Sequence, residues 1–353
     1  MRPYCRFRVC HYCRSRGSHR SVMAPPCPAA TVGRLLLHPE MLGRLLRILI
    51  TGGAGFIGSN LARLTLARDH DVIVLDDLST GFERNLKGLD VRFIRGSILD
   101  EIALAEAVVG VDSIVHLAAL GSVPRSIKDP VATHLANASG TLAVLEAARA
   151  AEMSHVVVAS SSSVYGMNPA LPKSEREWVR PMSPYAVTKL ATEQYPLAYQ
   201  QSYGMRTVAF RFFNVYGPLQ AAGHAYAAVI PTFVDALLAG ESLLINGDGT
   251  QSRDFTFVGT VCHVLLNACE RLLSHPEPVN LAFGTNTTLL QLVAKIEEVS
   301  GLTAEVAHRQ ARPGDVKHSQ ADNAVLRSLF PDVVPLSLEQ GLTETIEWFK
   351  ELQ

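Results

Sequence analysis

Six short runs of β-branched and other apolar residues recur between residues 47 and 215, and helix-like segments separate them. The runs occupy 47–51, 71–77, 91–97, 113–119, 155–163 and 206–215. In "NLARLTLARD" and "SGTLAVLEAARAAE", two of the intervening segments, apolar residues return every three or four positions, which is the period of an α-helix. Strands that alternate with helices predict a parallel sheet covered by helices. We therefore expect a doubly wound α/β domain.

The first predicted strand runs directly into "TGGAGFIG", in which Gly52, Gly55 and Gly58 precede a predicted helix. These glycines allow a tight turn and close backbone approach, and the helix N-terminus offers N–H groups and a positive dipole to a pyrophosphate. Asp76 ends the second predicted strand, where a carboxylate can accept from both hydroxyls of an adenosine ribose and repel a 2′-phosphate. The combination predicts a Rossmann-type site for NAD rather than NADP, although Asp76 alone would also suit a cap on the following loop.

Residues 184–189, "PYAVTK", place Tyr185 and Lys189 four positions apart on a predicted helix. Positions i and i+4 share a helix face, so both polar tips can reach one ligand. A free tyrosine has a pKa of ~10, which leaves roughly 0.1% phenolate at pH 7. We expect the lysine and a positively charged nicotinamide to lower this pKa toward neutrality. So short a motif is also typical of a snorkelling surface pair, and it gains meaning from its context.

Charge is distributed unevenly along the 353 residues. Residues 1–47 contain nine arginines and one acidic residue. Of the 32 basic and 33 acidic residues, 23 and 32 then fall in residues 48–353, which gives this part a net charge of −9. A negative body argues against nucleic acid as a partner, and no uncharged apolar run is long enough to cross a bilayer. We expect a soluble, cytoplasmic protein with a substantial core.

Four of the six cysteines lie at positions 5, 10, 13 and 27, which leaves Cys262 and Cys269 in a body expected to be reduced and free of disulfides. "CHYC" at 10–13 resembles half a zinc knuckle, but no second ligand pair follows at suitable spacing, so we expect no metal site. An Arg-rich, acid-poor start is typical of an organellar transit peptide, and equally of a true start at Met23 or Met41. Either way, residues 1–46 are expected to form an Arg/Cys-rich extension outside the fold.

Taken together, TGxxGxxG, a strand ending in serines and YxxxK resemble the extended short-chain dehydrogenase/reductase family over about residues 47–350. Seven blocks, in order, resemble UDP-hexose 4-epimerases, above all those that accept UDP-N-acetylglucosamine: "AALGSVPRSIKDP", "ASSSSVYG", "PMSPYAVTK", "RFFNVYG", "AYAAVIP", "NGDGTQSRDF" and "RPGDVKHSQAD". The resemblance implies a homodimer with tightly bound NAD and a UDP-sugar substrate. Such an enzyme takes the 4-hydroxyl proton, moves the C4 hydride to nicotinamide and returns it to the opposite face of the ketone.

The resemblance also implies roles for individual residues. Tyr185 with Lys189 would form the base, and Ser161 would bond the 4-oxygen, with Ser162 as a second hydroxyl; alone, the serine run would indicate a turn. Expected cofactor contacts are Gly52, Gly55, Phe56, Ile57, Gly58, Asp76, Asp77, Ser97, Ile98, Ala118, Tyr185 and Lys189. Expected substrate contacts are Gly121, Ser122, Ser161, Asn214, Ala228, Arg253, Arg312, Asp315 and Ser319.

Two features of the expected substrate site concern the diphosphate and the sugar of the substrate. Arg253 and Arg312 match positions that clamp the nucleotide diphosphate, for which a guanidinium fork is suited; the alternative is surface salt bridges to Asp254 and Asp315. The position of Ser319 walls the sugar pocket in the epimerases that the chain resembles, and a bulky aromatic residue there excludes a 2-acetamido group. Serine leaves room, so N-acetylated hexoses are expected to fit, with unacetylated UDP-glucose as a second substrate.

The residue at position 163 distinguishes 4-epimerisation from the reactions of related enzymes. Related 4,6-dehydratases and decarboxylating synthases carry an acidic residue around that point, whereas this chain has Ser163. Without a carboxylate, elimination or handling of a 6-carboxylate lacks its acid/base group, which favours epimerisation. A non-catalytic NAD(H)-sensing protein of the same fold is the alternative from another class, and it would be expected to lose Tyr185.

Two residues depart from the family pattern. Ser97 stands where the family usually carries an aspartate at the adenine, so that contact is expected to be weak or supplied by Asp100. Pro196 is expected to interrupt and kink the helix that begins near Tyr185, which makes the dimer geometry less secure. For domains, we expect an NAD-binding part at 47–213 plus about 257–283, and a smaller α/β nucleotide-sugar-binding part at 214–256 plus 284–353.

Overall fold

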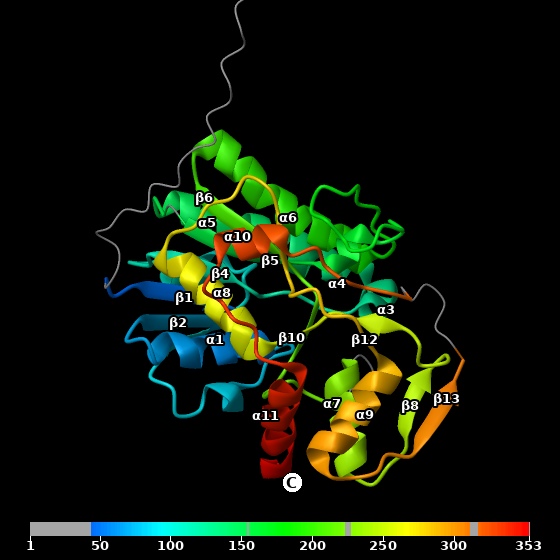
Figure 1. The fold of residues 1–353 in the computed structure, drawn as a ribbon. Helices are drawn as coiled ribbons and strands as arrows, with labels where there is room; N and C mark the ends of the chain where they lie inside the picture. Colours follow the sequence, from blue (N-terminus) through cyan, green and yellow to red (C-terminus); the bar gives the residue numbers. More distant parts are fainter. Residues whose placement is uncertain (1–43, 154, 223–226, 311–316, 353) are drawn as a thin grey trace, which may run out of the picture. The chain divides into compact units, whose positions relative to one another are not determined.

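The computed structural model describes residues 44–153, 155–222, 227–310 and 317–352. The "CHYC" segment, both alternative start residues, Arg312 and Asp315 lie outside these ranges. Within them, parallel strands form a seven-stranded sheet in the order β11-β6-β5-β4-β1-β2-β3 (Figure 1). The strands are β1 (Arg47–Thr51), β2 (Asp71–Asp76), β3 (Arg92–Arg95), β4 (Ser113–His116), β5 (His155–Ser161), β6 (Arg206–Phe212) and β11 (Val279–Leu281).

Each of the six predicted apolar runs forms a strand of this sheet. The central strands are buried almost along their whole length, because helices cover both faces of the sheet. The fifth run leaves the sheet after Ser161, and the following serines start a 3₁₀ turn, η4 (Ser162–Tyr165). The sixth run divides into β6 and a separate short strand, β7 (Asn214–Tyr216).

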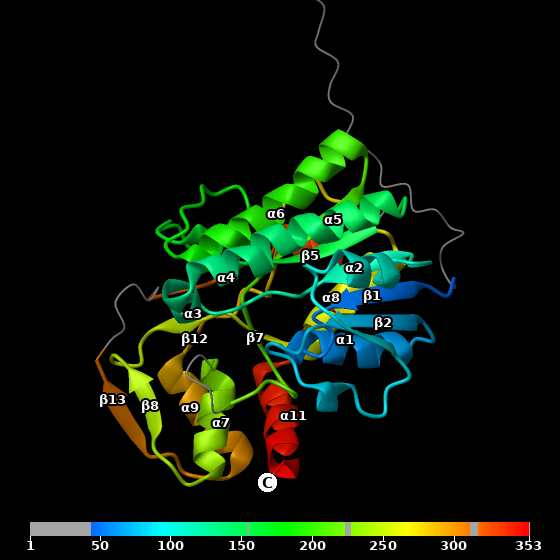
Figure 2. The same cartoon turned by 180° about the vertical axis from the view of Figure 1, so that it is seen from behind.

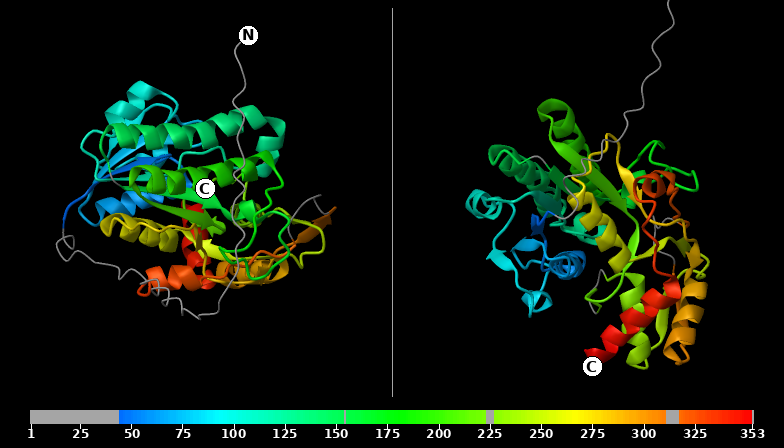
Figure 3. Two further views of the ribbon diagram at one scale, coloured as in Figure 1. Left: turned by 90° about the horizontal axis from the view of Figure 1, so that it is seen from above. Right: turned by 60° about the vertical axis from the view of Figure 1, so that its left-hand side comes forward.

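Helices form a layer on each side of the sheet, as Figure 3 shows. On one side, α1 (Phe56–Leu66) packs against α8 (Val258–Glu270). On the other side lie α2 (Glu101–Ala107), α5 (Gly140–Ala150) and α6 (Pro184–Tyr203). This arrangement confirms the predicted doubly wound, Rossmann-type fold. In the part of the chain that the structure describes, no helix has both the length and the apolar character needed to cross a membrane.

A smaller α/β region follows the large sheet (Figure 2). Its parallel strands are β8 (Leu243–Asn246) and β13 (Val306–Arg309), and its helices are α7 (Val229–Leu238), α9 (Leu289–Ser300) and α11 (Leu338–Glu351). The structure also contains two short strand pairs, β7 with β10 (Phe255–Phe257) and β9 (Ser252–Arg253) with β12 (Thr287–Thr288). Strand β11 returns to the large sheet after the first elements of the smaller region. We therefore propose an NAD-binding part at 47–213 plus about 257–283 and a nucleotide-sugar-binding part at 214–256 plus 284–353.

The prediction that Pro196 interrupts its helix is wrong. Helix α6 runs without a break from Pro184 to Tyr203 with Pro196 inside it. A proline removes one intrahelical hydrogen bond, but here its ring is buried and its carbonyl accepts a bond of 2.9 Å from the Thr207 hydroxyl. Tertiary contacts therefore hold the helix together across the residue that should have ended it.

Candidate active site

The glycine turn after β1 leaves no room for a side chain at Gly52 or Gly58. Gly52 has a φ of +71°, and a Cβ added there would lie 2.7 Å from the backbone nitrogen of Ala118, just after β4. A Cβ on Gly58 would lie 2.3 Å from the Gly52 carbonyl oxygen. Strands β1 and β4 are neighbours at the point where the strand order reverses, which is where open α/β sheets bind their ligands.

Asp76 at the end of β2 holds this turn in place. Its side chain is 7% exposed, and its carboxylate accepts hydrogen bonds from the N–H groups of Ala54 (3.0 Å) and Leu78 (2.8 Å). Burial raises the pKa of Asp76, and these two bonds oppose the rise. The loop-capping contact that the sequence left open is therefore present, and the same carboxylate lines the cavity described next.

A cavity of about 790 Å³ opens over the carboxyl ends of the strands and gathers most of the predicted site. All the predicted cofactor contacts line it: Gly52, Gly55, Phe56, Ile57, Gly58, Asp76, Asp77, Ser97, Ile98, Ala118, Tyr185 and Lys189. Of the predicted substrate and catalytic residues, Gly121, Ser122, Ser161 and Ala228 also line it. Ser162, Asn214, Arg253 and Ser319 lie outside the lining.

Ser161, Tyr185 and Lys189 meet in this cavity. Ser161 ends β5, and its side chain lies close enough to Tyr185, in the first turn of α6, to lower the pKa of that phenol. One turn later, the Lys189 ammonium donates a bond of 2.8 Å to the carbonyl of Ala159. Helix α6 starts at Pro184 after Ser183, whose hydroxyl accepts from the N–H of Ala186, and this cap fixes where the first turn begins.

The electrostatics of this group differ in part from the prediction. Burial raises the pKa of Tyr185, although the nearby side chain of Ser161 lowers it, so in this structure the pKa does not approach neutrality. Burial lowers the pKa of Lys189 to about 8. The lysine therefore still carries a charge at pH 7, but it directs that charge at the Ala159 carbonyl.

The predicted diphosphate and sugar contacts lie on neighbouring segments of the smaller region. Arg253 on β9 donates to the carbonyl oxygens of Ser252 (2.9 Å) and Lys317 (3.3 Å). The N–H of Ser319 donates to the same Ser252 carbonyl at 3.2 Å, so these two segments run side by side. Asn214 on β7 donates through its side chain to the Asp254 carbonyl.

The carboxylate of Asp254, the suggested salt-bridge partner of Arg253, has other bonds. It is fully buried and accepts from the N–H groups of Gly284, Thr285 and Ala321 at 3.0 to 3.1 Å. The Thr285 hydroxyl donates to it at 2.9 Å. Asp254 thus ties two distant segments, at 284–285 and at 321, to the strand that carries Arg253.

The suggestion that Asp100 replaces the missing aspartate at Ser97 is wrong. The Asp100 carboxylate accepts from the N–H groups of Ile102 (2.9 Å) and Ala103 (3.3 Å), which makes it the N-cap of α2. It does not line the cavity, whereas Ser97 does. A cap in this position satisfies two otherwise free N–H groups, which is the preferred use of such an aspartate.

Three polar residues that the sequence did not single out also belong to the site. Asn85 lines the cavity and donates from its side chain to the Ala54 carbonyl of the glycine turn at 2.9 Å. Ser160 and Gln220 line it as well. Of these three, only Ser160 had a signal, because it lies in the serine run at the end of a predicted strand. Asn85 comes from a short 3₁₀ helix, η2 (Glu83–Leu86), and Gln220 from a loop, and neither belongs to a motif.

His116 lies buried close to Lys189 and does not line the cavity. Its ring bonds the hydroxyls of Thr51 (2.8 Å) and Thr141 (3.1 Å). Burial, together with the charge of Lys189, lowers the pKa of His116 to about 3. The imidazole is therefore neutral at pH 7, which leaves Tyr185 as the better candidate for an acid/base group here.

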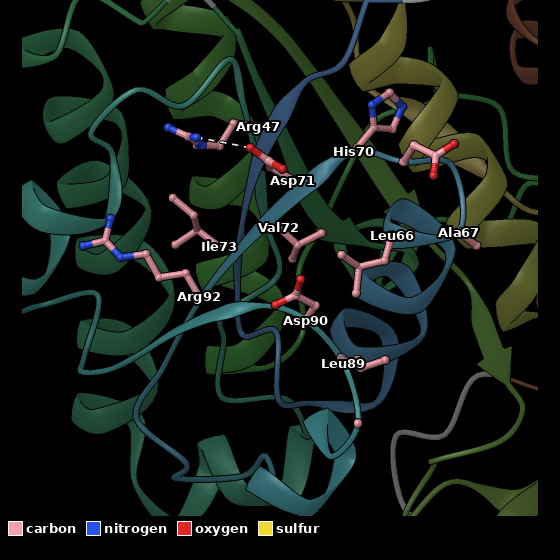
Figure 4. Close-up of a pocket in the computed structure, with 12 residues that line it drawn as sticks. Arg47, Leu66, Ala67, His70, Asp71, Val72, Ile73, Leu89, Asp90 and Arg92 are labelled. Carbon is pink, nitrogen blue, oxygen red and sulfur yellow. Dashed lines mark hydrogen bonds and ion pairs between the residues drawn. The ribbon is translucent and has the colours of Figure 1, made fainter.

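A second cavity, of about 800 Å³, opens at the opposite edge of the sheet, where β1, β2 and β3 begin (Figure 4). Two ion pairs involve its lining: Arg47 with Asp71 at 3.1 Å and Arg92 with Glu106 at 2.8 Å. The lining holds none of the predicted site residues that the structure describes. The chemistry therefore concentrates at the carboxyl edge of the sheet.

Comparison with known proteins gives a consistent result. The sequence matches the NAD dependent epimerase/dehydratase family over residues 48–282. It is 37% identical over 311 residues to a UDP-glucose 4-epimerase of Mycolicibacterium smegmatis, covering 86% of this chain and 99% of that relative. It is also 33% identical to a dTDP-glucose 4,6-dehydratase of Streptomyces niveus, covering 87% of this chain and 93% of that relative.

Solved structures agree with these relatives. A UDP-N-acetylglucosamine 4-epimerase from Methanobrevibacter ruminantium, in complex with UDP-N-acetylmuramic acid, superposes with a TM-score of 0.83 at 36% identity, covering 88% of this chain and all of that chain. A Thermus thermophilus UDP-glucose 4-epimerase in complex with NAD has a TM-score of 0.78 at 34% identity, covering 86% of this chain and 99% of that chain. The same family thus includes epimerases and a dehydratase, and NAD binds its members.

Proposed function

The chain belongs to the NAD-dependent epimerase/dehydratase family, and we propose that within this family it is a UDP-hexose 4-epimerase. The observation that carries the proposal is the meeting of Ser161, Tyr185 and Lys189 in the cavity that also contains the glycine turn. The residues present fit NAD: the turn has no room for a Cβ at Gly52 or Gly58, and Asp76 lines the cavity. A pyrophosphate would lie at the N-terminus of α1.

Each member of the group has a role in this reaction. Tyr185 takes the proton of the sugar 4-hydroxyl as a phenolate and later returns it. Ser161 holds the 4-oxygen by a hydrogen bond, and the protonated Lys189 stabilises the phenolate beside it. When bound, NAD supplies the acceptor and then the donor of the C4 hydride, and the positive charge of its oxidised ring favours the phenolate. A return of the hydride to the opposite face inverts C4.

The absence of a carboxylate at position 163 supports epimerisation over dehydration. Ser163 lies in η4, two residues after the catalytic serine, and its N–H donates to the Ser161 hydroxyl at 3.1 Å. A hydroxyl at this position is a poor acid or base near pH 7, so it gives no help with elimination at C5 and C6. Oxidation at C4 followed by return of the hydride needs no such group.

For the substrate, we propose UDP-N-acetylglucosamine and its C4 epimer, with UDP-glucose as a second substrate. The small side chains of Gly121, Ser122 and Ala228 line the cavity, and Ser319 is small as well. A roomy pocket rejects a smaller ligand only weakly, which is why both sugars are proposed. We place Arg253 and Arg312 at the diphosphate, where guanidinium groups bind bidentately.

The test is to incubate the purified full chain separately with UDP-N-acetylglucosamine, UDP-glucose and UDP-glucuronic acid, and to follow the C4 configuration by proton NMR. Formation of the galacto epimer from the acetylated sugar is the expected result. Conversion of UDP-glucose alone would contradict the open pocket and keep the mechanism. A persistent 4-keto-6-deoxy sugar or released carbon dioxide would show a dehydratase or a decarboxylase, and bound NAD without any conversion would indicate a sensor.

A further inference from the structure

A buried ion pair lies one helical turn beyond Lys189. Glu193 on α6 and Arg211 on β6 have side chains that are 0% and 3% exposed. Two bonds join them, at 2.7 Å and 3.0 Å, in the fork arrangement that a guanidinium and a carboxylate prefer. Glu193 is four residues after Lys189 and eight after Tyr185, so all three lie along one side of the helix.

The same carboxylate reaches the strand that ends in Ser161. The hydroxyl of Ser160 lies 2.8 Å from Glu193 Oε2 and 3.2 Å from the Lys189 carbonyl. Ser160 and Arg211 are partners in the register of β5 and β6, so both approach Glu193 from neighbouring strands. Ala159 and Ser160 therefore each bond α6, the first through the Lys189 ammonium and the second through Glu193, and the next residue, Ser161, lies close to Tyr185 of the same helix.

Arg211 also braces the turn on the other side of Ser161. Its guanidinium lies 4.7 Å from the centre of the Tyr165 ring, at the end of η4. The hydroxyl of Tyr165 donates a hydrogen bond of 2.7 Å to the side-chain oxygen of Asn280 on β11, which fixes that ring in the core. The Glu193–Arg211 pair thus supports the serine turn from the residue before Ser161 and from the turn after it.

We propose that Glu193 and Arg211 are positioning residues, which set the placement of Ser161 on β5 against the Tyr185–Lys189 side of α6. The proposal rests on the proposed function, since it assigns the reacting groups to those three residues. Neither member of the pair lines the cavity. Packing alone does not require charges at these positions. A protein in which apolar residues of similar volume replace a buried ion pair is often as stable as the original or more stable.

The decisive variant replaces both charges, Glu193→Leu with Arg211→Met. We expect it to fold with a Tm within a few degrees of the wild type, since both charges of the pair are removed together. Its kcat should fall by about tenfold or more while KM stays within about twofold, because small displacements of reacting groups affect the chemical step most. The matched control is Glu146→Leu with Arg149→Met, an exposed pair on α5 with side chains 43% and 47% exposed, which should leave kcat unchanged.

A second readout does not depend on epimerase activity. The ionisation of Tyr185 in the NAD-loaded protein is followed by ultraviolet difference titration against the same protein carrying Tyr185→Phe. We expect the midpoint of the Tyr185 titration to rise by about half a pH unit or more in the Glu193→Leu/Arg211→Met variant. In the Glu146→Leu/Arg149→Met control the midpoint should not change. If the chain converts none of the UDP-sugars, the proposed function fails, and this titration still tests the positioning role.

An unchanged kcat together with an unchanged Tyr185 midpoint in the folded double variant would overturn the proposal. Where the double variant does not accumulate as folded protein, Ser160→Ala decides the question. It removes only the hydroxyl between Glu193 and β5, and Arg211 continues to pair with the carboxylate. A kcat that falls a few-fold at constant Tm and KM supports the positioning role, and a wild-type kcat and midpoint contradict it.

Discussion

At the scale of single residues, the phenol of Tyr185 is the group that the proposed chemistry depends on most. Tyr185→Phe removes the hydroxyl and keeps the ring, so the fold should persist while kcat falls by about 10²- to 10⁴-fold, the usual contribution of a general base. Steady-state rates on the preferred UDP-sugar measure the loss. Tyr203→Phe, a change at an exposed tyrosine on the same helix, is the matched control and should keep full activity. Equal losses in both variants would remove Tyr185 from the mechanism.

The pH profile of the reaction should report on Lys189. Because the pKa of Lys189 is lowered to about 8, its charge is present at pH 7 and is lost as the pH rises through 8. The phenolate of Tyr185 needs that charge, so kcat should decrease above about pH 8. Burial alone raises the pKa of Tyr185, and we expect the charge of bound NAD to bring it below that of Lys189, so deprotonation of Tyr185 should limit the rate on the acid side. Rates measured from pH 5 to 10 test this, and a rate that keeps rising to pH 10 would contradict a role for the ammonium.

Ser319 should decide how well the acetamido group is accepted. Ser319→Tyr fills the space proposed for that group, so kcat/KM should fall by about tenfold or more for UDP-N-acetylglucosamine and by much less for UDP-glucose. The control is Ser328→Tyr, at an exposed serine on α10 (Ala324–Leu329). A parallel loss on both substrates would mean that Ser319 supports the fold rather than selecting the sugar.

At the scale of elements, the turn between β1 and α1 should be sensitive to a single methyl group. Gly52→Ala places a Cβ 2.7 Å from the backbone nitrogen of Ala118, at a φ of +71° that alanine disfavours. Relief of this clash requires a shift of the backbone at Ala118 or in the turn. NAD binding, followed by calorimetry, should weaken by at least tenfold. Gly88→Ala is the control, because Gly88 has a similar φ of +78° and open space around it. That variant should lose about 1 kcal/mol of stability and keep its affinity for NAD.

The elements themselves were largely predictable, because local patterns determine them. The apolar runs at 47–51 and 155–163 became β1 and β5, and the glycine spacing identified the turn between β1 and α1. Pro196 is the exception, since its effect was argued from the chain alone. Contacts from Thr207 and the buried surroundings of the ring outweigh the missing hydrogen bond.

Contacts between distant segments could not be predicted in the same way. The pairing of Glu193 with Arg211 depends on how α6 lies across β5 and β6, which no local pattern specifies. The sequence suggested Asp254 only as an alternative partner for the adjacent Arg253, and its carboxylate in fact bonds backbone groups that are 30 and 67 residues away. Buried polar groups find their partners only in the finished fold, so their roles follow from the structure.

At the scale of the whole molecule, exposed apolar side chains gather beside the site. Ile127, Val131 and Leu135 are 66%, 66% and 46% exposed and follow one another at four-residue spacing along α3 (Val123–Lys128), α4 (Pro130–His134) and the next turn, η3 (Leu135–Ser139). Helix α6 packs against α3 and α4 and adds Val187, 54% exposed, and Tyr195, 36% exposed. Contiguous apolar surface of this kind marks interaction sites. The homodimer that the sequence resemblance implies would bury it if this surface is the interface, with the same surface on both copies as a two-fold interface requires.

Two charges placed on this surface should separate the copies. Ile127→Asp with Val131→Asp buries carboxylates opposite their own counterparts if the dimer forms there, a costly arrangement with no compensating partner. Light scattering during gel filtration should give the mass of two chains for the wild type and of one chain for the variant. Ile102→Asp, at an isoleucine of α2 that is 81% exposed and away from this surface, should remain dimeric. A wild-type protein with the mass of a single chain would contradict the dimer. A dimeric double variant would place its interface elsewhere, because carboxylates cannot be buried against each other at pH 7 without weakening the association.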